Sequence, residues 1–295
     1  MAKTKIVTHS SKFHTDDIFA VATLSLVLGE ENIEVVRSRD PEVIKTGDYV
    51  VDVGGEYNLD TKRFDHHQKG GAGQRENGIP YASFGLVWKH FGTQVSGSEE
   101  VMKRIDQQLV QPVDAGDNGV KTFNKIIEDV NPYTIGAFFD TYNPSWKNED
   151  NVRINEFMTA VGIARGLLLR IISKEKDFFE ADRMVKDIYA SCEDKRLIVM
   201  DKYYPSNETL CNFPEPLFTV YPQGDGKWVI KAIKDDDESF DYRKYLPKDW
   251  SGKTGAELED VTGVTGANSC HNALFIATAK SKEAILKMAE IAINS

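Results

Sequence analysis

Cysteine is scarce in this sequence, and its spacing excludes two kinds of site. The 295 residues contain three cysteines, Cys192, Cys211 and Cys270, and no two of them form a Cys-x-x-Cys pair. An odd number of widely spaced thiols does not build a disulfide framework, and it does not supply the paired thiolates of a structural zinc site. Any metal bound here must therefore use nitrogen and oxygen ligands.

Positive charge and long apolar runs are also lacking. The chain has 36 Lys and Arg against 46 Asp and Glu, a net charge of −10. Nonspecific nucleic-acid binding draws on clustered Lys and Arg, so a broad phosphate-binding surface is excluded, whereas a short oligonucleotide or a small phosphate ester at a metal centre is not. No apolar run is long enough to span a membrane and no signal segment precedes the first strand, so we expect a cytoplasmic protein without a membrane partner. An oligomer is possible.

Several catalytic motifs are missing as well. The sequence has no His-Glu-x-x-His of a metalloprotease and no Gly-x-Ser-x-Gly of a serine hydrolase. Gly252-Lys253-Thr254 ends like a phosphate-binding P-loop, but Pro247 stands where that motif requires its first glycine.

The order of apolar runs predicts an α/β fold. Strand patterns at Ile6–Thr8, Ile33–Arg37 and Tyr49–Val53 are apolar on nearly every residue, and a helical pattern follows Asp16. Strands of this kind favour a parallel sheet with helices on both faces. Further helices are expected over 82–91, ended by Gly92, over 98–110, over 122–130 and within 151–191.

From Arg196 the pattern changes to strands, with a closing helix from about Lys282 to Ile293. We therefore predict two domains, a metal-binding catalytic domain over residues 1–195 and a smaller α+β substrate-binding domain over residues 196–295.

Histidine and aspartate gather in four separate segments. Two of the six histidines stand together in Asp65-His66-His67, and Asp52 ends the strand just before them. The other two segments are His9-Ser10-Ser11-Lys12-Phe13-His14-Thr15-Asp16 and Asp114-Ala115-Gly116-Asp117. In a parallel sheet, ligands sit beyond the carboxyl ends of strands, where most of these residues fall. Imidazole and carboxylate together suit Mn²⁺, Fe²⁺ or Zn²⁺.

Four such segments supply more ligands than one tetrahedral ion needs, which points to two ions bridged by a carboxylate. We assign the bridge to Asp52, one ion to His9 and His14, and the other to Asp16, His66 and Asp114. Asp117 is the alternative to Asp114. The two predicted catalytic residues are Asp65, which holds an imidazole in its ligand tautomer, and His67, which binds a phosphate oxygen or protonates the leaving group.

These motifs resemble those of the DHH phosphoesterase superfamily and, within it, the Myg family. The resemblance rests on the His9 to Asp16 segment, on Asp52-Val53-Gly54-Gly55, on Phe64-Asp65-His66-His67, on Val113 to Gly119 and on Tyr142-Asn143-Pro144-Ser145-Trp146, and it covers nearly the whole chain. It implies a DHH-type N-terminal domain, a substrate-gripping C-terminal domain and a di-metal cleft between them. Superfamily relatives use Mn²⁺ or Mg²⁺, and Myg relatives in eukaryotes are regarded as 3′→5′ exoribonucleases.

Two features depart from the superfamily pattern. His14 occupies the place of an aspartate, so we favour Mn²⁺, with Mg²⁺ possible. The Gly-Gly-Gly-His motif of nuclease members is reduced to spread glycines, Gly266 among them, followed by His271. With Arg37 and Arg39, these two residues are the candidate substrate contacts.

The predicted function is therefore hydrolysis of phosphodiester bonds by a metal-activated water. The resemblance implies a 3′→5′ exoribonuclease, with short RNA or a nucleotide as the substrate. Two alternatives stay open: a phosphatase for a small nucleotide or metabolite, and a metal-binding regulatory protein without catalysis.

Overall fold

The structure, a computed structural model, describes residues 2–124, 126–148, 154–237 and 239–295. The chain divides into two compact units, Met1–Lys176 and Asp177–Ser295, so the division falls within a long helix. The mixed α/β class is confirmed, because each unit holds one five-stranded sheet with helices packed on it. Among the described residues, no helix combines the length and the apolar character needed to cross a bilayer.

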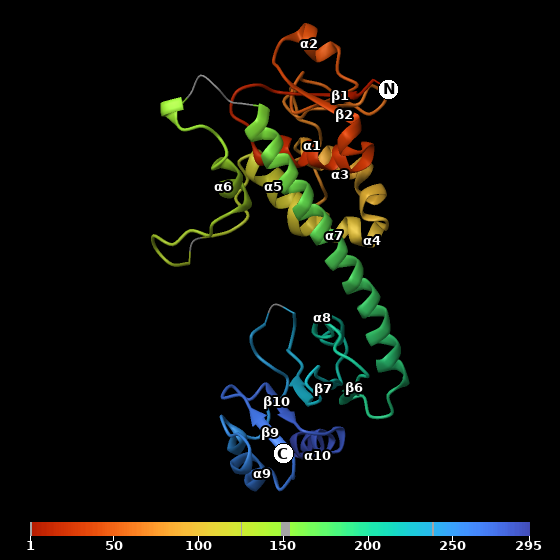
Figure 1. The fold of residues 1–295 in the computed structure, drawn as a ribbon, viewed down its shortest axis with the longest axis vertical. Coiled ribbons are helices and arrows are strands. Elements are labelled where there is room, and N and C mark those ends of the chain that lie inside the picture. The colour runs from red at the N-terminus through yellow and green to blue at the C-terminus, as the bar shows by residue number, and fades with distance from the viewer. Residues whose placement is uncertain (1, 125, 149–153, 238) are drawn as a thin grey trace. The chain divides into compact units, whose positions relative to one another are not determined.

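The first unit is built on a mixed sheet with the strand order β2-β1-β3-β5-β4, of which β1 and β2 are labelled in Figure 1. β1 pairs in parallel with β2 and β3, and β3 pairs in parallel with β5, but β4 runs antiparallel to β5. The strands are β1 Thr4–Thr8, β2 Ile33–Arg37, β3 Tyr49–Val51, β4 Tyr57–Asn58 and β5 Arg63–Phe64. The sheet is therefore not the purely parallel one that the sequence suggested, because the chain returns through β4 before it enters β5.

The helices of the first unit pack on this sheet and on one another. They are α1 Thr15–Leu28, α2 Pro41–Lys45, α3 Ser83–Ser96, α4 Glu99–Ile105, the π-helix η2 Asp106–Val110, α5 Gln111–Asp117 and α6 Ile135–Asp140. Short 3-10 turns, η1 Glu30–Asn32 and η3 Trp146–Asn148, lie between elements. All residues of α1 from Asp16 to Ser25 are buried, as expected for a helix that is apolar on nearly every side. α1 packs against α3, β1 and β3, so its first turn lies at the ends of these strands.

Two expected helices differ in the structure. α3 continues through Gly92 and ends at Gly97, whose left-handed backbone closes the helix. The residues described between Thr122 and Val130, with Lys125 outside them, form turns and bends in place of the predicted helix. Their apolar side chains are exposed, Ile126 by 96%, so that segment has no core that would hold it helical.

α7, Ile154–Ser191, connects the two units; the first three residues of the helical region predicted over 151–191 lie outside the described residues. The second unit has the strand order β6-β7-β8-β10-β9, with β6 parallel to β7 and the other pairs antiparallel. Its elements are β6 Leu197–Val199, α8 Asn207–Leu210, β7 Phe218–Pro222, β8 Trp228–Ala232, η4 Lys248–Trp250, α9 Ala256–Thr262, β9 Ala267–Cys270, β10 Ile276–Ala279 and α10 Lys282–Asn294. One core cluster joins the sheet to α10, and another joins it to the α7 residues Ala181 and Val185. The predicted boundary at 195/196 remains a prediction.

Gly85 in α3 is expected to be intolerant of a side chain. A Cβ at this position would lie 1.8 Å from Oδ2 of Asp114 and 2.9 Å from an Arg75 nitrogen. We expect Gly85→Ala to lower the free energy of unfolding by at least about 2 kcal/mol through overpacking. Gly162→Ala is the matched control, because a Cβ there meets no atom within 4 Å and Gly162 is an exposed helical residue. That control should raise the same free energy by about 0.5–1 kcal/mol in urea unfolding. Equal stability of the two variants would contradict the packing described.

Candidate metal centre

The parallel pairing of β1, β3 and β5 brings three predicted ligand segments to one edge of the sheet. His9 directly follows β1, Asp52 directly follows β3, and Asp65-His66-His67 directly follows β5. Because the three strands are neighbours and run in the same direction, their carboxyl ends lie together. Asp52 has a left-handed backbone, φ 54°, which is uncommon for a residue other than glycine. Strain of that kind persists only where surrounding structure holds the residue in place.

Asp52 lies between two imidazoles. Its Oδ2 is 3.3 Å from Nε2 of His9, and its Oδ1 is 3.4 Å from Nε2 of His66. All four atoms are buried, and none has a hydrogen-bond partner of normal geometry among the described residues. Buried polar atoms nearly always have a hydrogen-bond partner. A carboxylate and two imidazoles that face each other without hydrogen bonds therefore offer oxygen and nitrogen lone pairs that could bind a metal ion.

The ligand atoms form three overlapping groups, in each of which they lie within 4.8 Å of one another. The groups are Asp52, Asp65, His66 and His67; His9, His14 and Asp52; and Asp16, His66 and Asp117. Asp52 belongs to two of the groups, and His66 also belongs to two. Shared residues of this kind are expected where two metal ions bind next to each other. Of the predicted ligands, the structure brings together His9, His14, Asp16, Asp52 and His66.

Asp114, which we predicted as the sixth ligand, lies elsewhere. Its Oδ2 accepts a hydrogen bond of 2.7 Å from Nη1 of Arg75, and its Oδ1 accepts one of 3.0 Å from the backbone N–H of Gly85. The carboxylate that reaches the cluster from this segment is Asp117, with Oδ2 3.1 Å from Nε2 of His66 and Oδ1 3.9 Å from Nδ1 of His14. The geometry favours Asp117 over Asp114 as the candidate metal ligand, because the Asp114 carboxylate is already hydrogen-bonded to Arg75.

Asp17 also reaches the cluster, although it is not among the ligands predicted from the sequence. Its Oδ1 accepts the N–H of His14 at 2.8 Å, and its Oδ2 is 3.3 Å from Nε2 of His9. That second oxygen is buried and without a hydrogen-bond partner among the described residues. No signal in the sequence separates this aspartate from an ordinary capping residue, since its role depends on where β1 places His9.

The predicted catalytic pair is in contact. Asp65, 1% exposed, accepts a 2.7 Å hydrogen bond from Nδ1 of His67, and the same oxygen accepts the N–H of His66 at 2.8 Å. The His67 side chain is 60% exposed, so a buried carboxylate orients an accessible imidazole. This pairing leaves Nε2 of His67 for contact with a bound molecule.

The carboxylates crowd one another. Burial, together with the charges of Asp52 and Asp117, raises the pKa of Asp16 well above its usual value, and burial raises the pKa of Asp17 to about 7. Burial would also raise the pKa of Asp52, but the imidazoles of His66 and His9 outweigh it and hold that pKa well below its usual value. Burial would lower the pKa of His66, yet the carboxylates of Asp117 and Asp52 raise it to about 11. A divalent cation would relieve this repulsion, and it would displace a proton from His66 as it bound.

Two of the four predicted substrate contacts, Arg37 and Arg39, belong to the first unit. Arg37 donates a 2.9 Å hydrogen bond to the carbonyl of Ser11 and lies over the rings of Phe13 and Phe157, while Arg39 is exposed two residues further on. Arg37 is thus in contact with residues of the first unit, and its role as a phosphate contact remains a prediction.

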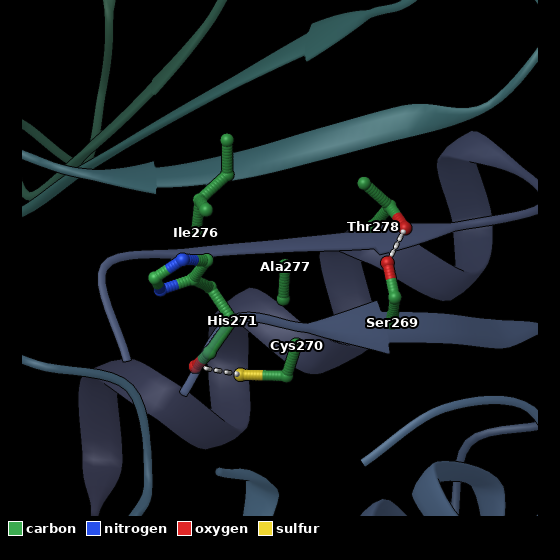
Figure 2. Close-up of a pocket in the computed structure, with 6 residues that line it drawn as sticks. All are labelled: Ser269, Cys270, His271, Ile276, Ala277 and Thr278. Atoms are coloured by element: carbon green, nitrogen blue, oxygen red, sulfur yellow. Dashed lines mark hydrogen bonds between the residues drawn. The ribbon is translucent and has the colours of Figure 1, made fainter. Parts of the chain in front are cut away.

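Gly266 and His271 belong to the second unit. Gly266 has φ +90° and donates to Oε1 of Glu259. His271 lines a cavity of about 310 Å³, with its ring centroid 4.7 Å from that of Phe275. Figure 2 shows the cavity, where Ser269 and Thr278 share a 2.7 Å hydrogen bond.

Comparison with known proteins agrees with this arrangement of motifs. The model of the family MYG1_exonuc, described as Uncharacterised protein family (UPF0160), matches residues 5–293. The MYG1 exonuclease of Rattus norvegicus is 30% identical over 324 residues, which cover 98% of this chain and 84% of that protein. The MYG1 protein of Chlamydia muridarum is 30% identical over 291 residues, 94% of this chain and 92% of that protein. The chain therefore belongs to the MYG1_exonuc family, and the resemblance to the Myg family is confirmed.

Asp114 and Asp117 can be separated by matched substitutions to asparagine. We expect Asp117→Asn to weaken Mn²⁺ binding at least about 100-fold, because loss of residues that merely support ligands already costs 10–100-fold. Asp114→Asn should leave Mn²⁺ binding within a few-fold of the wild type. It should lower the free energy of unfolding by about 1–3 kcal/mol, because the new amide nitrogen cannot accept from Arg75. Titration calorimetry and urea unfolding measure the two effects, and the reverse pattern would restore Asp114 as the ligand.

Proposed function

We propose that this member of the MYG1_exonuc family is a metal-dependent phosphoesterase that removes nucleotides from short RNA in the 3′→5′ direction. The observation that carries the proposal is Asp52, whose two carboxylate oxygens face the imidazoles of His9 and His66 without hydrogen bonds of normal geometry. Relatives from rat, mouse and human bear the name MYG1 exonuclease, which supports nuclease chemistry. The motif resemblance to DHH phosphoesterases supports the phosphoester bond, and the resemblance to the Myg family supports the RNA substrate and the polarity.

Two divalent ions fit the donor set. His9, His14 and Asp52 would hold one ion, and Asp16, His66 and Asp117 the other, with Asp52 offering one oxygen to each side. Mixed imidazole and carboxylate ligands favour Mn²⁺ over Mg²⁺. Two bound ions would activate a water for attack on phosphorus and neutralise the charge that develops on the leaving oxygen.

Asp65 and His67 supply the proton transfer in this proposal. The Asp65 carboxylate accepts a hydrogen bond from Nδ1 of His67. The other ring nitrogen, Nε2, is therefore the one that can exchange a proton with a bound molecule, and the His67 side chain is exposed. An imidazole held in this way can donate a proton to the 3′-oxygen of the shortened RNA as the P–O3′ bond breaks.

The first test is nucleotide release that depends on Asp52. With Mn²⁺, the wild-type protein should release mononucleotides from a 5′-labelled RNA of about ten residues that ends in a 3′-OH. Asp52→Asn should reduce the rate at least about 100-fold, since the variant loses the carboxylate whose two oxygens face His9 and His66. Asp60→Asn, at an exposed position in the same unit, is the control that should retain the wild-type rate.

The outcomes separate the alternatives. No release by the wild type with Mn²⁺, Mg²⁺ or Co²⁺ would exclude the nuclease. Release of phosphate from nucleoside monophosphates, without release of nucleotides from RNA, would identify the small-molecule phosphatase. Neither product, with tight metal binding, would identify a regulatory protein.

The second test addresses His67. His67→Ala should slow RNA cleavage about 100-fold, because a general acid contributes at least that factor. The same variant should cleave a p-nitrophenyl ester of a nucleotide at nearly the wild-type rate, because p-nitrophenolate leaves without a proton. An equal loss on both substrates would show that His67 binds phosphate or metal and does not protonate the leaving group.

A further inference from the structure

The segment Ser10 to His14 carries a candidate metal ligand but forms no helix or strand. The His14 side chain is 58% exposed, so its own packing does not fix it. Ser11 has a left-handed backbone, φ 76°, which bends the segment sharply after His9. The position of His14 therefore depends on what holds the backbone on either side of it.

Asn143 holds that backbone through both polar groups of one residue. Its Oδ1 accepts the N–H of Phe13 at 3.0 Å, and its Nδ2 donates to the carbonyl of Phe13 at 2.8 Å. The amide thus pairs with Phe13 as a neighbouring strand would, from a position 130 residues further along the chain. Asn143 is itself held by Asp140, whose carbonyl accepts the Asn143 N–H at 3.0 Å and whose carboxylate accepts from Nδ2 at 3.3 Å.

Other contacts also hold this segment, among them the 2.8 Å hydrogen bond from the N–H of His14 to Oδ1 of Asp17. The ring of Phe13 is 1% exposed and packs edge-on against Phe157 at 5.5 Å. Arg37 covers both rings and donates to Ser11. The Phe13 side chain is buried and its backbone is hydrogen-bonded to Asn143. These contacts restrict the conformation of Phe13 and so the position of His14, the next residue.

We propose that Asn143 is a positioning residue that sets the place of His14 in the group of His9, His14 and Asp52. It acts through the Phe13 peptide and touches neither the metal ligands nor a substrate. The inference rests on the proposed function only in that this group binds a metal ion. It explains why the turn after α6, Tyr142 to Trp146, carries a sequence motif although it holds no ligand itself.

The proposal predicts a loss confined to one ion. Asn143→Ala should weaken the binding of one of two Mn²⁺ ions about 10–100-fold in titration calorimetry, the range for groups that support ligands, and leave the other unchanged. In the metal-free protein, hydrogen exchange of the Phe13 amide should speed up, while the amides of α1 and α3 keep their protection. Asn143→Asp, which keeps an acceptor for the Phe13 N–H but loses the donor, should fall between alanine and the wild type.

The control is Asn32→Ala. Asn32 also donates to a backbone carbonyl, that of Leu28 at 2.9 Å, but at the other end of α1. This variant should bind both ions as the wild type does.

Each other outcome decides a different question. Two ions bound by Asn143→Ala with wild-type affinity would overturn the positioning role and leave the proposed function intact. Equal weakening of both ions, with faster exchange throughout the unit, would show a purely structural residue. A wild-type protein that binds Mn²⁺ but releases no nucleotide would contradict the proposed nuclease activity. The metal-binding measurements would then still decide whether Asn143 positions His14. A wild type that binds no divalent ion would overturn both.

Discussion

The candidate site of the first unit depends on how the repulsion among its buried carboxylates is compensated. Asp16, Asp17 and Asp52 are almost fully buried, and they lie in one cluster with Asp117. Buried charges of one sign are unfavourable unless hydrogen bonds, opposite charge or a cation compensate them. The protein supplies part of this compensation through the imidazoles of His9 and His66, and the remainder is what a divalent ion provides.

The elements around the cluster also compensate the negative charge of its carboxylates. The first turn of α3 donates the N–H groups of Ser83 and Phe84 to the carboxylate of Asp16, at 3.0 and 2.7 Å. Helix N-termini stabilise negative charge in this way. One residue further on, Gly85 donates to Asp114, and the absence of a side chain lets that carboxylate approach the helix. Arg75 then joins Asp114 to Asp106 in the π-helix, so one guanidinium fixes the loop before α3 to the helices that lead to Asp117.

The sequence predicted the parts of the site that depend on strand ends. His9, Asp52 and Asp65-His66-His67 each follow an apolar run, and parallel pairing is enough to bring them together. Asp114 and Asp117 could not be distinguished in this way, because the choice depends on Arg75, 39 residues from Asp114 in sequence. The contacts of Arg37 show the same limit, because the sequence does not show that Phe13 and Phe157 pack against its guanidinium. The helix expected between Thr122 and Val130 had the right spacing of apolar residues, yet spacing cannot supply a surface on which to bury them.

The distribution of the ligands along the chain has a consequence for biosynthesis. A ribosome releases His9, His14, Asp16, Asp52 and His66 within the first 66 residues, whereas Asp117 and Asn143 emerge much later. A nascent chain that has formed only β1 to β5 already gathers acids and imidazoles, but it lacks the amide that pairs with Phe13 and the carboxylate that faces His66. A cation that binds the complete centre would therefore bind only after the first 143 of the 295 residues have been translated.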